Sequence, residues 1–314
     1  MIKNSTILIT GGAGFIGSTL ANALLSDNQV VVLDDLSMGT WDNLIDSPNL
    51  TKIEGSVTNH SLLWQLVHEH AFDYIFHLAA IASVADSIAR PVETHAVNYD
   101  STLQLLEIIR QSQKPLKRFI FSSSAAVYGN APEFPKKETS SIKPLSPYAV
   151  DKFASERMCA IYNELYKIPT TMARFFNVYG PAQNPASPYS GFISILVDKL
   201  KSNQELTIYG DGNQSRDFVY VDDVVAALLL LAVSETSRGQ VYNVGTGIAT
   251  TLNDLVHVAE EISHRKASVK FKAARSGDIK DSLSDISELK ALNFQPRQTI
   301  ENGMANYLNH ERLI

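Results

Sequence analysis

Short apolar runs alternate with amphipathic segments through the first half of the chain, and this alternation limits its possible folds more than any other feature. Near-continuous apolar strands separated by helices indicate a parallel sheet with helices on both faces. We therefore predict an α/β fold built on a doubly wound parallel sheet. The expected strands are residues 5–10, 28–34, 50–55, 74–79, 118–124 and 169–175, and the expected helices are residues 15–27, 61–70, 97–113 and 148–166.

The rhythm changes after about residue 176, where residues 180–191 are rich in proline, glycine and serine and shorter elements follow. The apolar run 240–245 is expected to rejoin the sheet, so the second lobe is built from discontinuous pieces. We predict a first domain of residues 1–176, to which residues 216–245 return, and a smaller C-terminal lobe of residues 177–215 and 246–314.

Composition and charge argue against nucleic-acid and membrane partners. The formal net charge of -6 is opposite to the basic face of most nucleic-acid binders. The longest apolar run, residues 224–233, is about half as long as a membrane-spanning helix. The first residues are too short and too quickly broken by glycine for a signal peptide, so we expect a soluble, cytoplasmic protein. The single cysteine, Cys159, excludes an intramolecular disulfide and a multi-cysteine metal site.

The stretch TGGAGFIG, residues 10–17, follows the first strand and opens the first helix. Gly11 allows a sharp turn, Gly14 allows the backbone to approach a pyrophosphate, and Gly17 allows close packing of helix on strand. Asp34 ends the second strand, where it would accept hydrogen bonds from an adenosine ribose and repel a 2′-phosphate. The pattern predicts a Rossmann domain that binds NAD rather than NADP. The alternative is a structural glycine turn beside a strand-end acid.

Other residues at the same edge of the sheet are candidates for contact with the cofactor. Ser56 and Val57 end the third strand, where a side chain could reach the adenine. Ala79 and Ala80 end the fourth strand, where small side chains leave room. The remaining candidates in or beside these motifs are Phe15, Ile16, Ser37, Leu78 and Ser122.

Tyr148 and Lys152 lie four residues apart at the start of a predicted helix, a spacing that places both on one face. A free phenol has a pKa of about 10 and is a poor base at neutral pH. A neighbouring ammonium and a positively charged nicotinamide would favour the phenolate. Such pairs also occur by chance on helix surfaces, but the glycine fingerprint and the serines at 122–124 favour a catalytic pair here.

Motifs spread over nearly the full length resemble those of the extended short-chain dehydrogenases/reductases, specifically the NAD-dependent epimerase/dehydratase family. They are TGGAGFIG, LDDLS, HLAA, the SSS before VYG, Tyr148-x-x-x-Lys152, RFFNVYGP, GDGNQSRDFVYVDD and RSGD. The resemblance implies bound NAD, a nucleoside-diphosphate sugar as substrate and transient oxidation of that sugar. By its motif position, Ser124 resembles the family's catalytic hydroxyl. Asn98 resembles the asparagine that orders the active-site backbone, and Lys152 is expected to hold the nicotinamide ribose.

The residues after Ser124 bear on the reaction. Dehydratases of this family typically place an Asp-Glu pair there and decarboxylating relatives often a Glu, whereas this chain has Ala125 and Ala126. Without an acid to expel the 6-hydroxyl, elimination should stop at the ketone. The resemblance therefore implies 4-epimerisation, in which Tyr148 takes the 4-hydroxyl proton with help from Ser124 while C4 gives hydride to NAD. The 4-keto sugar then turns and receives the hydride on its opposite face.

Residues of the predicted second lobe resemble the family's contacts with the nucleoside diphosphate. Asn177, Arg216 and Arg275 occupy such motif positions, and the planar guanidinium of arginine suits phosphate oxygens. Asp278 is expected to approach the ribose or to brace Arg275. For each arginine the alternative is a solvated surface charge.

Further positions bear on the base and the sugar. Thr207 and Tyr209 would flank a uracil, which makes UDP the expected nucleotide. Epimerases restricted to non-acetylated hexoses tend to carry a tyrosine where this chain has Ser282. Because serine leaves more room, we predict interconversion of UDP-N-acetylglucosamine and UDP-N-acetylgalactosamine, with UDP-glucose and UDP-galactose as a second candidate pair. Gly191 is expected to leave space in the sugar pocket.

Two departures from the family pattern and three alternatives remain. Ser56 replaces a frequent aspartate that binds adenine, and Ala182 replaces a frequent arginine. The alternatives are a strict UDP-glucose 4-epimerase, a UDP-glucuronate 4-epimerase and a non-catalytic NAD-binding sensor. Residues 98–111 and 150–165 resemble helices that form a four-helix dimer interface in the family, so we expect a homodimer. Alternatively, their apolar faces only cover the sheet.

Overall fold

The computed structural model describes residues 2–184, 191–274 and 280–314. The chain divides into two compact units, each formed from several segments. The first unit comprises Met1–Gly129, Ile142–Arg174 and Val225–Tyr242, and the second comprises Asn130–Ser141, Phe175–Val224 and Asn243–Ile314.

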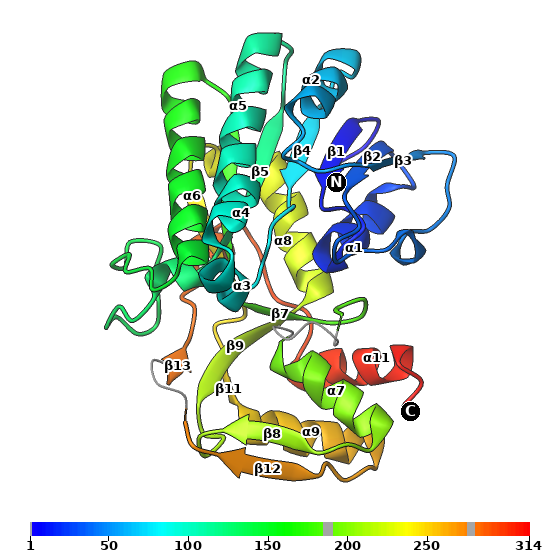
Figure 1. The fold of residues 1–314 in the computed structure, drawn as a ribbon, viewed down its shortest axis with the longest axis vertical. Helices are drawn as coiled ribbons and strands as arrows, with labels where there is room; N and C mark the ends of the chain where they lie inside the picture. Colours follow the sequence, from blue (N-terminus) through cyan, green and yellow to red (C-terminus); the bar gives the residue numbers. More distant parts are fainter. Residues whose placement is uncertain (1, 185–190, 275–279) are drawn as a thin grey trace. The chain divides into compact units, whose positions relative to one another are not determined.

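The described residues of the first unit form a seven-stranded sheet in the order β10-β6-β5-β4-β1-β2-β3 (Figure 1). The strands are β1 (Thr6–Thr10), β2 (Gln29–Asp34), β3 (Leu50–Glu54), β4 (Tyr74–His77), β5 (Arg118–Ser124), β6 (Thr170–Phe175) and β10 (Val241–Val244). β1 pairs in parallel with β2 and β4, β2 pairs with β3, and β4 pairs with β5. This order reverses between β1 and β4, so the predicted doubly wound fold is confirmed.

Helices cover both faces of this sheet. The main apolar core packs the strands against α2 (His60–Glu69), α5 (Ser101–Ser112) and α6 (Pro147–Tyr166). On the other side of the sheet lie α1 (Phe15–Leu24) and α8 (Val221–Val233) (Figure 1). Because both faces are covered, the central strands are buried almost continuously, which explains their unbroken apolar sequences.

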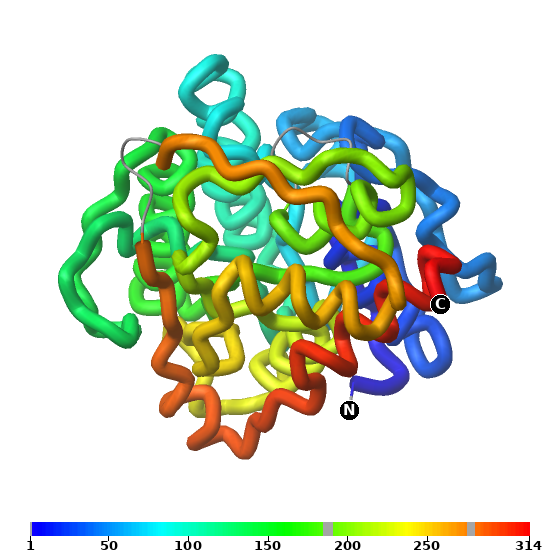
Figure 2. The backbone as a smooth tube through the Cα atoms, turned by 90° about the horizontal axis from the view of Figure 1, so that it is seen from below, coloured from blue at the N-terminus to red at the C-terminus, as the bar shows by residue number. Residues whose placement is uncertain are grey.

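The second unit contains shorter strands and its own helices. β9 (Ser215–Tyr220) pairs antiparallel with β11 (Ala249–Thr251) and in parallel with β7 (Asn177–Tyr179) and β13 (Asp281–Ser282). β8 (Leu206–Tyr209) pairs in parallel with β12 (Val269–Lys272), and Figure 2 shows these two strands side by side. The helices assigned to this unit are α7 (Phe192–Ser202), α9 (Leu252–Ser263), α10 (Ser287–Ala291) and α11 (Ile300–His310).

The boundaries between the units differ from the expected ones most clearly at residues 130–141 and 216–224, and also at residues 175–176 and 243–245, which belong to the second unit. Residues 130–141, expected in the first domain, belong to the second unit. Of the segment expected to return, residues 216–224 also belong to the second unit, since β9 pairs with its strands. The predicted strand at 240–245 does rejoin the large sheet as β10, next to β6.

Within the described ranges, no helix is long and apolar enough to cross a membrane. The same residues contain no cluster of histidine, cysteine, aspartate and glutamate that could hold a metal ion. Cys159 is buried in the core of the first unit, with a free thiol.

Candidate active site

The glycine loop between β1 and α1 leaves no room for side chains at two of its positions. Gly11 adopts a φ of +69°, and a Cβ there would lie 2.7 Å from the backbone nitrogen of Ala79. A Cβ on Gly17 would lie only 2.1 Å from the carbonyl oxygen of Gly11. Gly14 caps α1 without a side-chain hydrogen bond, so the amides of the first turn stay available. An uncapped helix N-terminus beside a glycine loop fits a pyrophosphate.

Asp34, at the end of β2, lies against this glycine loop. Its Oδ2 accepts a hydrogen bond from the backbone N–H of Ala13 at 2.9 Å, and its Oδ1 accepts one from Leu36 at 2.8 Å. Burial raises the pKa of the carboxyl group, and the backbone hydrogen bonds oppose that rise. The strand-end carboxylate is therefore fixed against the glycine loop, with lone pairs left for ribose hydroxyls.

The other predicted cofactor contacts lie at the same sheet edge but differ in exposure. Ser37 is exposed and Ser56 is half-buried, and their hydroxyls bond locally to Asp35 (2.6 Å) and Thr58 (2.9 Å). Val57 packs into the apolar core and is 5% exposed. Five further candidates are half-buried beside β1 or β4, namely Phe15, Ile16, Leu78, Ala79 and Ala80.

α6 presents Tyr148 and Lys152 on one buried face. The helix begins at Pro147, because the Ser146 hydroxyl accepts a hydrogen bond from the N–H of Ala149 and caps its first turn. Tyr148 is 9% exposed and Lys152 is 3% exposed. The Lys152 Nζ donates to the carbonyl oxygen of Ser122 at 2.8 Å and lies 5.9 Å from the centre of the Tyr148 ring.

Burial dominates the electrostatics of this pair. Burial raises the pKa of Tyr148, and a side-chain hydrogen bond with Ser124 partly offsets this rise. Burial lowers the pKa of Lys152 to about 7. The ammonium was expected to lower the pKa of the phenol, but the buried lysine is itself easily deprotonated, and desolvation of the phenolate prevails.

The three consecutive serines at the end of β5 have three different partners. The Ser122 hydroxyl donates to the carbonyl oxygen of His77 at 3.1 Å. The Ser123 hydroxyl donates to Glu156 at 2.8 Å. Ser124 caps η3 (Ala125–Tyr128) by accepting from the N–H of Ala126 at 3.1 Å, and it also interacts with Tyr148. Ser124 is therefore the serine placed to act with the phenol.

Asn98 lies within η2 (Ala96–Asp100), a π-helical turn directly before α5. Its Oδ1 accepts from the backbone N–H of Ile81 at 2.8 Å, and its Nδ2 donates to the carbonyl oxygen of Ile81 at 3.1 Å. Both hydrogen bonds hold the backbone that follows β4. A buried side chain that satisfies both groups of one peptide position fixes that loop.

Sequence reasoning missed two buried polar groups near this face. His77 lies between Thr10 Oγ1 (2.7 Å) and Thr102 Oγ1 (3.1 Å), and burial lowers its pKa to about 3. Arg174 of β6 forms an ion pair with Glu156 of α6. The signal for the second was a charged residue inside the apolar strand 169–175, within the RFFN motif.

Two of the predicted substrate residues are brought into register in the second unit. Ser282 of β13 pairs opposite Arg216 of β9. The Nη1 of Arg216 donates to the carbonyl oxygens of Ser215 at 2.7 Å and Lys280 at 3.0 Å. The adjoining strands thus fix the Arg216 guanidinium against the backbone that precedes β13.

The other substrate candidates lie on separate elements of this unit. Thr207 and Tyr209 are both on β8, two residues apart, so they share a face. Asn177 begins β7 and is exposed, and Gly191 caps α7. Arg275 and Asp278 lie outside the described residues.

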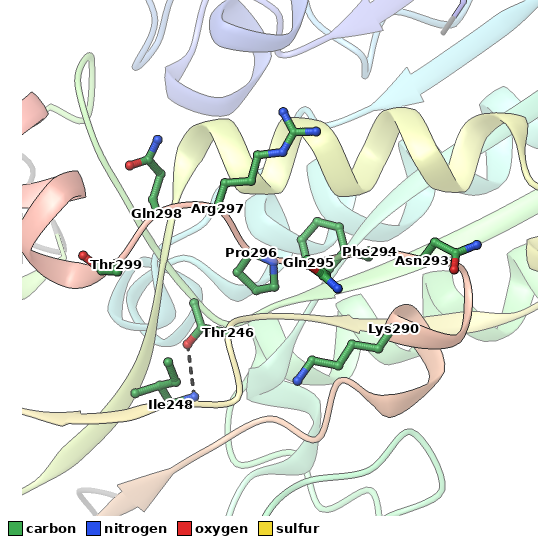
Figure 3. Close-up of a pocket in the computed structure, with 10 residues that line it drawn as sticks. All are labelled: Thr246, Ile248, Lys290, Asn293, Phe294, Gln295, Pro296, Arg297, Gln298 and Thr299. Atoms are coloured by element: carbon green, nitrogen blue, oxygen red, sulfur yellow. Dashed lines mark hydrogen bonds between the residues drawn. The ribbon is translucent and has the colours of Figure 1, made fainter.

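A cavity of about 540 Å³ lies in the second unit, between the loop after β10 and the segment that leads to α11 (Figure 3). None of the predicted site residues in the described part of the chain line it. Its two cationic residues, Lys290 and Arg297, point in different directions in Figure 3. The cavity therefore lacks the converging charges of an anion site.

Comparison with known proteins assigns the chain to a family. Residues 7–245 match the model of the NAD-dependent epimerase/dehydratase family. The chain belongs to this family. The UDP-glucose 4-epimerase of Mycolicibacterium smegmatis is 36% identical over 304 residues, which cover 95% of this chain and 96% of that protein. The family and the NAD cofactor predicted from the sequence are thereby confirmed.

Solved structures of two epimerases match the fold over almost its whole length. The UDP-N-acetylglucosamine 4-epimerase of Methanobrevibacter ruminantium, in complex with UDP-N-acetylmuramic acid, has a TM-score of 0.94 at 37% identity and covers 99% of both chains. The UDP-glucose 4-epimerase of Thermotoga maritima, with UDP-glucose, has a TM-score of 0.92 at 36% identity and covers 98% of both chains. The two relatives are named for different sugars, so the family match leaves the sugar open.

Proposed function

We propose that this protein is an NAD-dependent 4-epimerase of UDP-hexoses that interconverts UDP-N-acetylglucosamine and UDP-N-acetylgalactosamine, alongside UDP-glucose and UDP-galactose. The observation that carries the proposal is the arrangement of buried Tyr148 and Lys152 with half-buried Ser124 at the same sheet edge as the glycine loop. It provides a proton acceptor for a sugar hydroxyl and a site for a nicotinamide cofactor in one unit.

The residues of the first unit fit NAD. The glycine loop and the free amides of α1 would hold the pyrophosphate, and Asp34 would accept hydrogen bonds from the adenosine ribose. Lys152 would donate to the hydroxyls of the second ribose. When bound, NAD accepts a hydride from C4 of the sugar and later returns it.

In its phenolate form, which the positive charge of bound NAD would favour over the effect of burial, Tyr148 would take the proton of the sugar 4-hydroxyl and later give it back. Ser124 would donate a hydrogen bond to the same sugar oxygen and hold it beside the phenol. Loss of this proton and of the C4 hydride converts the alcohol to a ketone. Return of the hydride to the opposite face of C4, and of the proton to the 4-oxygen, gives the 4-epimer, so the reaction consumes no external reductant.

Ala125 and Ala126 support epimerisation rather than dehydration. Both lie in η3, directly after Ser124. Neither carries a titratable group, so the positions that follow the catalytic serine supply no acid for loss of the 6-hydroxyl. The 4-ketone would then be reduced again rather than eliminated.

The proposed sugar preference rests on Ser282. Its register opposite Arg216 supports a position near the diphosphate and sugar, and its small side chain leaves room for an N-acetyl group at C2. Arg216 and Asn177 would bind the diphosphate. Thr207 and Tyr209 would flank the uracil, and Gly191 would leave space for the sugar. Arg275 and Asp278 remain candidates for the phosphate and ribose.

Proton NMR of the enzyme incubated separately with UDP-glucose and UDP-N-acetylglucosamine tests this function. We expect anomeric signals of the galacto product in both incubations. Product from UDP-glucose alone would favour a strict UDP-glucose 4-epimerase, and product only in a third incubation, with UDP-glucuronate, would favour a uronate enzyme. A 6-deoxy signal would overturn the assignment, since only a dehydratase produces it.

We also infer a homodimer formed through α5 and α6. The apolar surface at the end of α6 supports this inference, since Leu165 is 62% exposed and Tyr166 is 47% exposed there. An exposed apolar helix end is typical of a packing surface for another helix. A four-helix arrangement of α5 and α6 from two copies would cover it.

A further inference from the structure

Glu156 and Arg174 form an ion pair that is almost fully buried in the first unit. The Arg174 Nη2 lies 2.6 Å from Glu156 Oε1, and its Nε donates to Oε2 at 2.9 Å. The two side chains are 4% and 3% exposed. This is the bidentate geometry of a strong arginine–carboxylate pair.

Two further residues join the network, of which Ser123 directly precedes the proposed catalytic serine Ser124 and Tyr128 follows it by four residues. The Ser123 hydroxyl donates to Glu156 Oε2 at 2.8 Å. The Arg174 Nη1 donates to the Tyr128 hydroxyl at 2.8 Å, and its guanidinium carbon lies 4.8 Å from the centre of that ring. The network therefore joins the end of β5, the turn η3, the helix α6 and the strand β6.

A buried ion pair is weak evidence for stability, because desolvation of two charges offsets most of their attraction. The same unit contains a second buried arginine, which is held by neutral oxygen atoms instead of a buried carboxylate. Arg118, at the opposite end of β5, donates to the carbonyl oxygen of Ser234 at 2.8 Å and to the hydroxyls of Thr171 and Ser237 at 3.3 Å. Its nearest carboxylate, Glu235, is 89% exposed. Stability alone therefore does not require a buried carboxylate for Arg174.

The position of Glu156 on α6 suggests what the pair does. Glu156 follows Lys152 by four residues and Tyr148 by eight, so all three lie on one face of the helix. Ser123 directly precedes Ser124. The Ser123–Glu156 hydrogen bond thus links the strand end that carries Ser124 to the helix that carries Tyr148.

We propose that Glu156, held by Arg174, is a positioning residue that fixes the distance between Ser124 and Tyr148 through its hydrogen bond with Ser123. This inference rests on the proposed epimerase function. It predicts that a change in the network alters turnover with little effect on substrate binding, because the residues proposed to bind the nucleoside diphosphate are unchanged.

Ser123→Ala is the first test. We expect kcat to fall about tenfold or more, as small misplacements of reacting groups do, with KM changed less than about twofold. Ser123→Thr keeps the hydroxyl and should restore most of kcat. Arg118→Met, in the same strand, is the matched control and should lower thermal stability without this loss of kcat. Unchanged kcat in Ser123→Ala would overturn the proposal.

The double variant Glu156→Leu/Arg174→Met separates positioning from stability. An apolar pair often replaces a buried ion pair with little loss of stability. We expect thermal unfolding close to that of the unmodified protein, with kcat still reduced about tenfold or more. A double variant that has both the stability and the kcat of the unmodified protein would overturn the proposal. Should this variant unfold, the Ser123 variants decide alone.

Titration of Tyr148 gives a readout that needs no substrate. Ultraviolet difference titration against Tyr148→Phe reports the ionisation of this phenol. The Lys152 Nζ lies 5.9 Å from the centre of its ring, and the neighbouring His77 stays neutral because burial lowers its pKa to about 3. In Ser123→Ala we expect a higher pKa, because the hydrogen bond with Ser124 weakens. An unchanged pKa of Tyr148 in Ser123→Ala would refute the proposed positioning role of Glu156. An unmodified protein that turns over no UDP-hexose would instead refute the proposed function.

Discussion

Lys152 is an amine held almost entirely out of water, and burial lowers its pKa to about 7. Its Nζ keeps one hydrogen bond to the carbonyl oxygen of Ser122, which holds the amine in place in either charge state. The amine therefore changes charge near neutral pH instead of remaining an ammonium. Among the ionisable side chains around it, His77 stays neutral, since burial lowers its pKa to about 3.

This burial predicts how stability depends on pH. Between pH 7 and the ordinary pKa of lysine, the unfolded chain binds a proton at Lys152 that the folded chain does not. Stability of the cofactor-free protein should therefore rise with pH across this window, by up to ~1.4 kcal/mol per pH unit from this group. Denaturant unfolding at several pH values should show the rise, and Lys152→Met should flatten it. An equal slope in both proteins would contradict the prediction.

Tyr148→Phe separates an enzyme from a protein that only senses NAD. Removal of the phenolic hydroxyl removes the proposed proton acceptor, so we expect epimerisation to fall by about 10²- to 10⁴-fold. NAD binding, measured by calorimetry, should change little. A sensor would show no turnover before the substitution and unchanged NAD binding after it.

Ser282→Tyr tests the proposed sugar preference. A bulky ring at this position should exclude the N-acetyl group, so we expect turnover of UDP-N-acetylglucosamine to fall about tenfold or more relative to UDP-glucose. Ser282→Ala, which keeps the space, is the matched control. An equal loss on both sugars would reject the steric explanation.

At the scale of elements, the strands of the large sheet were predictable because their sequences are apolar on both faces. The shortest strands were not, because β13 has two residues and β7 has three, too few for any periodicity. The glycine loop and the Tyr148–Lys152 pair are local patterns and were found directly. The Glu156 network was not, because Ser123, Glu156 and Arg174 come together only through packing of β5, α6 and β6.

The glycine loop predicts different effects at two of its positions. A Cβ at Gly17 would collide with the backbone of Gly11 and Gly12, whereas one at Gly14 would lie 3.3 Å from the Gly11 oxygen. We expect Gly17→Ala to lower the free energy of unfolding by about 1–3 kcal/mol and Gly14→Ala to lower it less. Both should weaken NAD binding. Thermal unfolding and calorimetry check this, and equal destabilisation would contradict the packing argument.

At the scale of the whole molecule, the unit boundaries were the least predictable feature, because the chain crosses between units several times. Residues 130–141 illustrate the reason. They join the second unit through contacts such as the hydrogen bond from the Lys136 N–H to the carbonyl oxygen of Leu283, almost 150 residues away. No local pattern in the segment reports a partner that distant in sequence.

The inferred homodimer is a further property of the whole molecule. Analytical ultracentrifugation should give the mass of two chains, and Leu165→Glu on α6 should shift the protein towards the monomer because it places a charge in the apolar interface. Val233→Glu is the control, since Val233 is 41% exposed and lies at the end of α8, outside the proposed interface of α5 and α6. A monomeric unmodified protein would exclude the dimer.

The three serines that end β5 also restrict how this chain can change in length. Each hydroxyl meets a different partner, so deletion of one residue from the strand would present each partner with the wrong neighbour. Substitutions here can be mild, as Ser123→Thr should be, whereas insertions and deletions should abolish function. Among descendants of this sequence, loops would vary in length while this strand would keep its residue count.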